Sequence, residues 1–200
     1  MQPLASAART QSTQLVVLCA LSFLALIGTD RAAGSAPAPD LSTSKYEVRF
    51  MKEMIDHHAM AVMMAEICQQ KAVHAELLTM CQSIELAQTQ EIATMQRWLA
   101  SWYSETHAPQ MSQGSQQQMT RLAALPGAAF EIAFMERMIR HHWKAIVRAA
   151  QCVDRAYHDE LIEMCEDIIV AQSAEIEQMR TWLCQWYGRC NYGPKGTLRN

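Results

Sequence analysis

Two pairs of adjacent histidines are the side chains of this 200-residue chain best suited to chemistry. The pair His57-His58 returns 84 positions later as His141-His142. A neutral imidazole is a metal ligand that suits zinc, copper and iron, and together with a thioether it favours Cu(I). Both pairs fall inside apolar stripes of the sequence, and their burial costs free energy unless they find partners. The histidines are therefore expected to meet either other polar groups or a metal ion.

Glutamates and methionines share these stripes with the histidines. If a disulfide ties two antiparallel helices that each rise 1.5 Å per residue, His58 falls beside Glu91. The second copy of the pattern places His142 beside Glu175 in the same way. Packing the two copies together gives one central layer of histidines and glutamates flanked by methionines. The candidate metal ligands are His57, His58, Met54, Met64, Glu91 and Met95 in the first copy and His141, His142, Met138, Glu175 and Met179 in the second.

Two interpretations of this layer are open. A buried hydrogen-bond network from His to Glu and Gln would fix the register of the helices without any ligand. A metal site would use the same side chains to hold copper, zinc or iron. Iron oxidation chemistry is disfavoured, because the Glu-x-x-His signature of di-iron bundles is missing at His57. The sequence has no nucleophile elbow, glycine-rich phosphate loop or zinc-protease motif, so we favour a binding protein over an enzyme such as an oxidase.

A methionine cluster directly after the first histidine pair is a second candidate site. Met60 and Met63 fall roughly 100° or more off the core stripe, and we expect them to face outwards. Exposed methionines near histidines would make a soft site suited to Cu(I). A wide apolar face covered by the following connector is the alternative. The second copy replaces the cluster by Lys144, Val147 and Arg148, so any such site belongs to the first copy alone.

The elements that must position these side chains come from an internal repeat. Residues 50–103 recur at 134–187, with about 25 of 54 aligned positions identical. In each copy, apolar residues return at helical steps of three and four along two stretches separated by a short turn. A repeat of this length is one supersecondary unit that needs a partner to bury its apolar face. The sequence therefore predicts an all-α fold, a four-helix bundle made of two duplicated helical hairpins.

The rest of the chain connects and flanks these hairpins. A stretch rich in Gln, Ser and Met, with Pro109 and Gly114, predicts a connector long enough to cross the end of a bundle. Expected helices cover 46–70, 75–103, 129–156 and 158–187. The expected organisation is a signal peptide at 1–34, a flexible lead-in at 35–45, hairpin repeat 1 at 46–103, the connector at 104–128, hairpin repeat 2 at 129–187 and an irregular tail at 188–200, with one domain over 46–187.

Six cysteines remain once Cys19, which lies in the N-terminal apolar run, is set aside. An even number of cysteines in an exported chain favours disulfides. Two cysteines recur with the same spacing in both copies, so the simplest connectivity lies within each hairpin. We expect the pairs Cys68–Cys81, Cys152–Cys165 and Cys184–Cys190. Metal-bound thiolates are the alternative.

The N-terminus predicts export. Arg9 precedes an apolar run over 15–27, and small residues follow at Ala32, Ala33 and Gly34. The run is too short to span a bilayer, so the pattern is typical of a cleaved signal peptide, with an uncleaved anchor as the alternative. We expect a secreted or periplasmic protein without stable membrane insertion. The net charge of −3 and the lack of a basic stripe argue against a nucleic-acid partner, and the sequence names no protein partner.

Both hairpins carry the motifs of a known family. The first copy reads Met54-Ile-x-His57-His58, then Met64-Ala65, then Gln88-x-x-Glu91-Ile92-x-x-Met95-x-x-Trp98-Leu99. The second copy reads Met138-Ile-x-His141-His142 and Gln172-x-x-Glu175-Ile176-x-x-Met179-x-x-Trp182-Leu183. In these residues the chain resembles domain of unknown function family 305. The resemblance implies a ferritin-like four-helix bundle, usually exported, with some members tied to copper binding through His and Met.

Carried over residue by residue, the resemblance implies copper ligands among the histidine pairs and the methionines Met54, Met64, Met95, Met138 and Met179. Arg148 replaces the counterpart of Met64, so a second site of the same kind is not expected. The function predicted first is an exported bundle that binds copper for buffering or resistance. The alternative is a structural or partner-binding bundle whose His/Glu network serves packing only.

Overall fold

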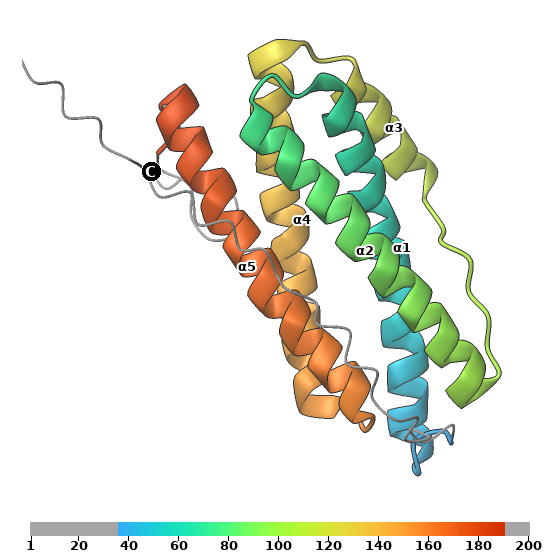
Figure 1. Ribbon diagram of the computed structural model, residues 1–200. Coiled ribbons are helices and arrows are strands. Elements are labelled where there is room, and N and C mark those ends of the chain that lie inside the picture. Colours follow the sequence, from blue (N-terminus) through green and yellow to red (C-terminus); the bar gives the residue numbers. More distant parts are fainter. Residues whose placement is uncertain (1–35, 191–200) are drawn as a thin grey trace, which may run out of the picture. The chain divides into compact units, whose positions relative to one another are not determined.

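The structure is a computed structural model that describes residues 36–190. These residues belong to one compact unit, and within the described range every regular element is a helix (Figure 1). The helices are α1 (Leu41–Lys71), α2 (Ala75–Tyr103), α3 (Gln113–Ala123), α4 (Gly127–Arg155) and α5 (Asp159–Tyr187). The all-α fold predicted from the repeat is therefore confirmed. The proposed signal peptide and the end of the tail lie outside the described residues.

Two long helical hairpins, α1–α2 and α4–α5, form the four-helix bundle. A short turn joins the helices of each hairpin, and a disulfide ties them close to that turn. The bonds are Cys68–Cys81 and Cys152–Cys165, each with Cα atoms 6.2 Å apart, and Cys184–Cys190 beyond the end of the second hairpin. The predicted connectivity is confirmed, and the thiolate-ligand alternative for these cysteines is wrong.

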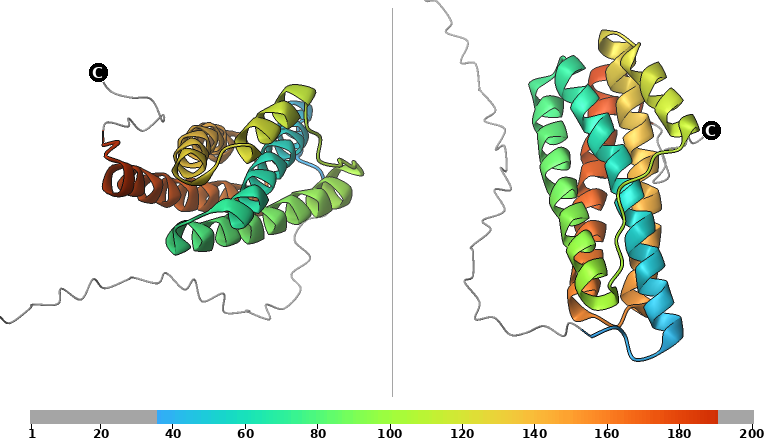
Figure 2. Two further views of the ribbon diagram at one scale, coloured as in Figure 1. Left: turned by 90° about the horizontal axis from the view of Figure 1, so that it is seen from above. Right: turned by 90° about the vertical axis from the view of Figure 1, so that its right-hand side faces the viewer.

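The hairpins pack on each other mainly through α1 and α4, which run antiparallel. The start of α1 lies against the α4–α5 turn, since Glu47 accepts hydrogen bonds from Tyr157 and His158. Helix α3 packs on both α1 and α4, on the side away from α2 and α5 (Figure 2). The contact between α1 and α4 therefore forms the middle of the bundle, and the histidine pairs lie on these two helices.

Two buried glutamates at equivalent positions lock the hairpins together. Glu131 of α4 accepts hydrogen bonds from the backbone N–H groups of Val73 (2.6 Å) and His74 (2.9 Å) in the opposite turn. It also contacts the His74 ring and accepts from the hydroxyl of Tyr187. Glu47 of α1 makes the same set of bonds with Tyr157, His158 and Tyr103. Each hairpin thus closes the turn of the other, and the two copies are related by an approximate two-fold axis.

Two segments that were predicted from the sequence to be irregular contain helix. Helix α1 begins at Leu41, inside the predicted lead-in, because the Asp40 carboxylate accepts a hydrogen bond from Thr43 N at 2.9 Å and caps the helix. Helix α3 lies inside the predicted connector and begins after Ser112, whose hydroxyl caps it in the same manner. Both caps precede residues without the full apolar periodicity on which the prediction depended. No helix in the described range is both long and apolar enough to cross a membrane.

Candidate metal centre

The four histidines of the two pairs come together where α1 crosses α4. The rings of His57 and His141, which are equivalent positions of the repeat, stack with centroids 3.6 Å apart. Each ring has its sequence neighbour, His58 or His142, at 6.2 Å. His58 and His142 are fully buried. The two-fold axis therefore passes through a compact cluster of imidazoles, as the helix geometry predicted for the layer.

His58 and His142 each contact a glutamate of their own hairpin. His58 Nε2 lies 2.7 Å from Glu91 Oε2, and His142 Nε2 lies 2.8 Å from Glu175 Oε2. These are the two pairs that the rise per residue predicted from the disulfide. His58 Nε2, Glu91 Oε2 and His142 Nε2 nevertheless lack hydrogen-bond geometry, so the contacts are close but not directional.

The layer holds an unusual number of buried polar atoms without a hydrogen-bond partner among the described residues. Such atoms cost about 1–3 kcal/mol each when nothing satisfies them. Those outside the two histidine–glutamate contacts comprise both ring nitrogens of His57 and His141, Nδ1 of His58 and His142, and the side-chain oxygens of Gln88 and Gln172. Lone pairs of neutral nitrogen gathered in this way are suited to a metal ion.

His57 and His141 stay neutral over a wide pH range. Burial, followed by the charges of neighbouring groups such as His58 and Arg148, lowers the pKa of His57 from 6.5 to about 2. Burial and the neighbouring His57 and His142 also hold the pKa of His141 well below its ordinary value. Protons therefore compete weakly for these nitrogens, which keep their lone pairs free for a metal.

The methionines predicted as ligands flank the layer inside the core. Met54 and Met95 are fully buried in one apolar cluster, and Met138 and Met179 are fully buried in the other. Among residues 36–190, no three side chains of the His, Cys, Asp and Glu types converge so as to hold a metal ion. Thioether sulfur is the other donor type beside this layer, and it favours Cu(I) over harder ions.

The methionine cluster of the first hairpin is partly covered, as the alternative of an apolar face under the connector expects. Met60 and Met63 are half-buried, and Met60 lines a hollow together with Met111 and Ser112 of the chain before α3. Met60 and Met64 line a cavity of about 110 Å³ together with Met119 of α3 and His141 of α4. Sequence reasoning missed Met119. The Ser112 cap and the apolar spacing of Met119 and Leu122 were the signals for a helix there.

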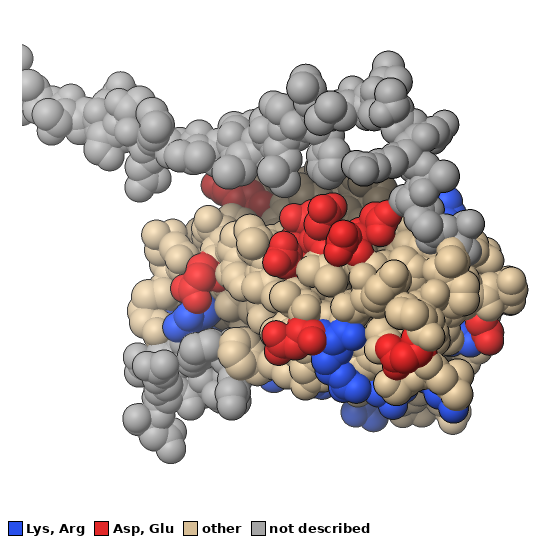
Figure 3. Space-filling view, turned by 90° about the horizontal axis from the view of Figure 1, so that it is seen from below, with Lys and Arg blue, Asp and Glu red and all other residues tan. Residues whose placement is uncertain are grey.

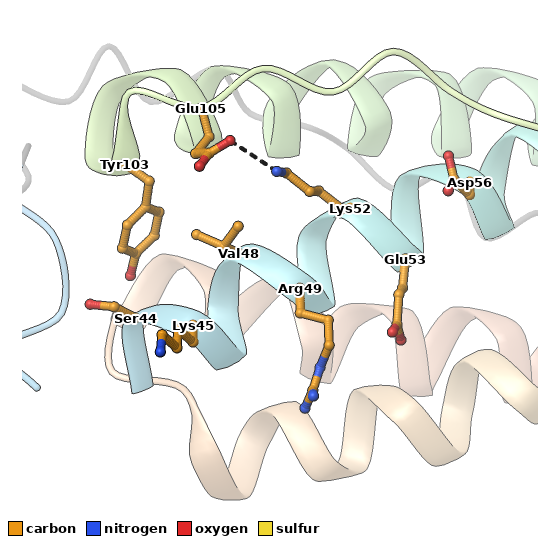
Figure 4. Close-up of a pocket in the computed structure, with 9 residues that line it drawn as sticks. All are labelled: Ser44, Lys45, Val48, Arg49, Lys52, Glu53, Asp56, Tyr103 and Glu105. Carbon is orange, nitrogen blue, oxygen red and sulfur yellow. Dashed lines mark hydrogen bonds and ion pairs between the residues drawn. The ribbon is translucent and has the colours of Figure 1, made fainter. Parts of the chain in front are cut away.

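Another hollow in the described part of the chain is lined mainly by charged side chains. This hollow of about 420 Å³ beside the start of α1 is lined by Lys45, Arg49 and the ion pair of Lys52 with Glu105, at 2.9 Å (Figure 4). On the face seen from below, several acidic side chains gather in one group, while basic side chains lie mainly on the lower part of the view, some of them beside acidic ones (Figure 3). Exposed side chains of opposite charge form surface ion pairs, which contribute little to the free energy of folding.

Comparisons with known proteins agree with this architecture. The family model described as "Domain of unknown function (DUF305)" matches residues 47–183. CopM in the Cu(I)-bound form is 32% identical, over 71% of this chain and 98% of that chain, with a TM-score of 0.64. CopM in the Cu(II)-bound form is 33% identical, over 70% of this chain and 97% of that chain, with a TM-score of 0.65.

A DUF305 fragment from Deinococcus radiodurans is 24% identical, covers 74% of this chain and 97% of its own, and has a TM-score of 0.62. At that identity the likeness shows the fold alone. No curated protein matches the chain.

Proposed function

This chain belongs to the DUF305 family, and from that premise we propose that it is an exported protein that binds copper for buffering or resistance. The observation that carries the proposal is the cluster of buried histidine nitrogens without hydrogen-bond partners. A bound metal ion would satisfy these lone pairs, whose burial is otherwise unfavourable. The similar protein CopM has been crystallised with Cu(I) and with Cu(II), which supports copper as the first metal to test.

Export is supported by the three disulfides, because such bonds persist in oxidising compartments such as the periplasm or the extracellular space. The signal peptide proposed for residues 1–34 would deliver the chain there.

In this proposal the histidines and methionines hold the metal. His57 and His141 offer nitrogen at the two-fold axis, and Met54 and Met138 lie one helical turn before them. Imidazole with thioether is the donor combination that favours Cu(I). The remaining proposed ligands are His58, His142, Met64, Met95 and Met179. Glu91 and Glu175 would act through the histidines that they contact, by fixing the orientation of those rings.

Competition titrations with a coloured Cu(I) chelator test the proposal. The parent protein should withdraw Cu(I) from the chelator, and a double variant His57→Ala/His141→Ala should bind it at least about tenfold more weakly, a change of about 1.4 kcal/mol. Circular dichroism of the variant should retain the helical spectrum. Equal affinity of the parent and the variant, or no binding by either, would contradict a copper site at these histidines.

A purely structural layer is the second candidate, and one observation favours it. The short distances from His58 to Glu91 and from His142 to Glu175 are those of ion pairs that could fix helix register without a ligand. A structural layer predicts no saturable copper binding and a large loss of stability when a histidine is removed in the absence of metal.

A further inference from the structure

We propose that α3, which lies between the two repeats, supplies a thioether ligand to a soft, monovalent metal ion at one side of the histidine cluster. The inference rests on the proposed copper function and deepens it. The ion would sit in the cavity lined by Met60, Met64, Met119 and His141. The metal is Cu(I) or Ag(I), because thioethers select soft ions.

The cavity has the size and the donors of a small ion site. Its volume of about 110 Å³ exceeds the share of about 30 Å³ that one water molecule takes in the liquid. Met64 and Met119 are buried to 1% and 4% exposure, so their sulfur atoms would bind without competition from bulk solvent. His141 is 7% exposed, and neither of its ring nitrogens has a hydrogen-bond partner among the described residues. Three thioethers and one imidazole thus line one partly open cavity.

The chain holds α3 over this cavity by contacts on both neighbouring helices. On α1, Asp56 accepts a hydrogen bond from Gln110 N at 2.7 Å and contacts the His107 ring at 2.8 Å. On α4, Arg137 donates to the backbone carbonyl of Gln118, the residue before Met119, at 2.9 Å. These anchors fix the position of Met119, so the methionine is placed by tertiary contacts and not by chance packing.

The charges around the cavity favour a monovalent ion. Arg137 and Lys144 of α4 line the same space. Their repulsion of a bound cation is proportional to the charge of that cation, so a divalent ion is disfavoured twice as strongly in free energy. The thioether and imidazole donors carry no charge, so they do not offset that repulsion. Carboxylates would offset it.

The site occurs once among residues 36–190, although the hairpins are duplicated. Lys144 and Arg148 are the counterparts of Met60 and Met64 in the second repeat, and α3 has no copy within that range. The repeat alone would give either two such sites or none. The insertion of a methionine-bearing helix on one side therefore creates one asymmetric site beside a symmetric histidine layer.

Substitution of Met119 tests the inference. In titrations with Cu(I) under competition, Met119→Leu and Met60→Leu should each weaken binding about tenfold or more. Leucine keeps the volume, so the fold should remain. Met164→Leu, at a half-buried methionine of α5 that packs in the other apolar cluster, is the matched control and should bind as the parent does. X-ray absorption of the Cu(I)-loaded protein should show fewer sulfur neighbours in Met119→Leu than in the control.

The outcomes separate this inference from the proposed function. If Met119→Leu and Met60→Leu bind Cu(I) like the parent while His57→Ala/His141→Ala loses it, copper binds at the histidines and α3 contributes no ligand. If the parent itself does not bind Cu(I), both proposals are wrong.

A variant at Lys144 tests whether the basic side chains set the selectivity between Cu(I) and Cu(II). Lys144→Gln should strengthen the binding of both copper ions, and the factor for Cu(II) should be about the square of the factor for Cu(I). An increase of about threefold for Cu(I) would therefore accompany one of about ninefold for Cu(II). Equal factors, or no change, would mean that the basic side chains do not set the selectivity.

Discussion

An imidazole buried at the centre of a helical bundle needs a partner for each ring nitrogen, and His57 and His141 have none among the described residues. Their stacking at 3.6 Å places two polar rings in contact with each other and not with polar donors. A layer selected only for stability would be better filled with apolar side chains, because these carry no unsatisfied groups. Burial of these histidines therefore lowers the stability of the metal-free protein, and a bound ligand would remove that penalty.

This cost can be measured directly. In metal-free protein, the double variant His57→Leu/His141→Leu should be at least as stable as the parent. Its free energy of unfolding should be unchanged or higher by up to about 3 kcal/mol, because buried unsatisfied nitrogens are replaced by apolar groups. Urea unfolding with a chelator present is the measurement. A loss of more than about 2 kcal/mol would instead support a structural hydrogen-bond network.

Helices α2 and α5 are equivalent elements that end in the same motif with different residues. Both C-caps are left-handed, with φ of 52° at Ser104 and 64° at Gly188. The next residue then donates back to the helix, from Glu105 N to Leu99 O and from Arg189 N to Leu183 O. Glycine takes this conformation without strain, whereas serine has a Cβ atom that opposes it.

The duplication supplies a matched pair of variants for this element. Ser104→Gly should raise the free energy of unfolding by about 1 kcal/mol, because the strain at the cap disappears. Gly188→Ser should lower it by about the same amount. Thermal and urea unfolding of both variants would check the prediction, and an unchanged stability in both would show that these helix ends are not strained.

At the scale of the whole molecule, Glu47 and Glu131 connect the two hairpins. Burial would raise the pKa of each carboxyl, but hydrogen bonds from a tyrosine hydroxyl and from the opposite turn outweigh it and lower the pKa below 4.5. In the unfolded chain both carboxyls return to that ordinary value. The stability they contribute is therefore fully present above about pH 4.5 and is lost as the pH falls through the lowered value of the folded state.

The consequence is an acid-sensitive interface between the hairpins. Glu47→Gln and Glu131→Gln should each destabilise the protein by about 3 kcal/mol at neutral pH, since the charged acceptor of several hydrogen bonds is gone. The double variant should also lose less stability than the parent between pH 5 and about pH 3. Urea unfolding at several pH values tests this. An identical pH dependence of the parent and the double variant would contradict the assignment.

Local periodicity was enough to predict much of this molecule. The helical hairpins, the disulfides and the contacts of His58 with Glu91 and of His142 with Glu175 follow from 3.6 residues per turn and 1.5 Å per residue inside one hairpin. Those quantities are fixed once two antiparallel helices are tied at a known level. The repeat then requires the second hairpin to do the same.

The docking of one hairpin on the other was decided by the tertiary structure alone. The stack of His57 on His141, the closure of the α1–α2 turn by Glu131 and the position of Met119 over the cavity join segments far apart in the chain. No local pattern specifies such contacts, because they depend on which faces of two finished hairpins fit together and on where an intervening helix finds room. The sequence by itself determined the donors and the hairpins that carry them, whereas tertiary packing decided which donors meet.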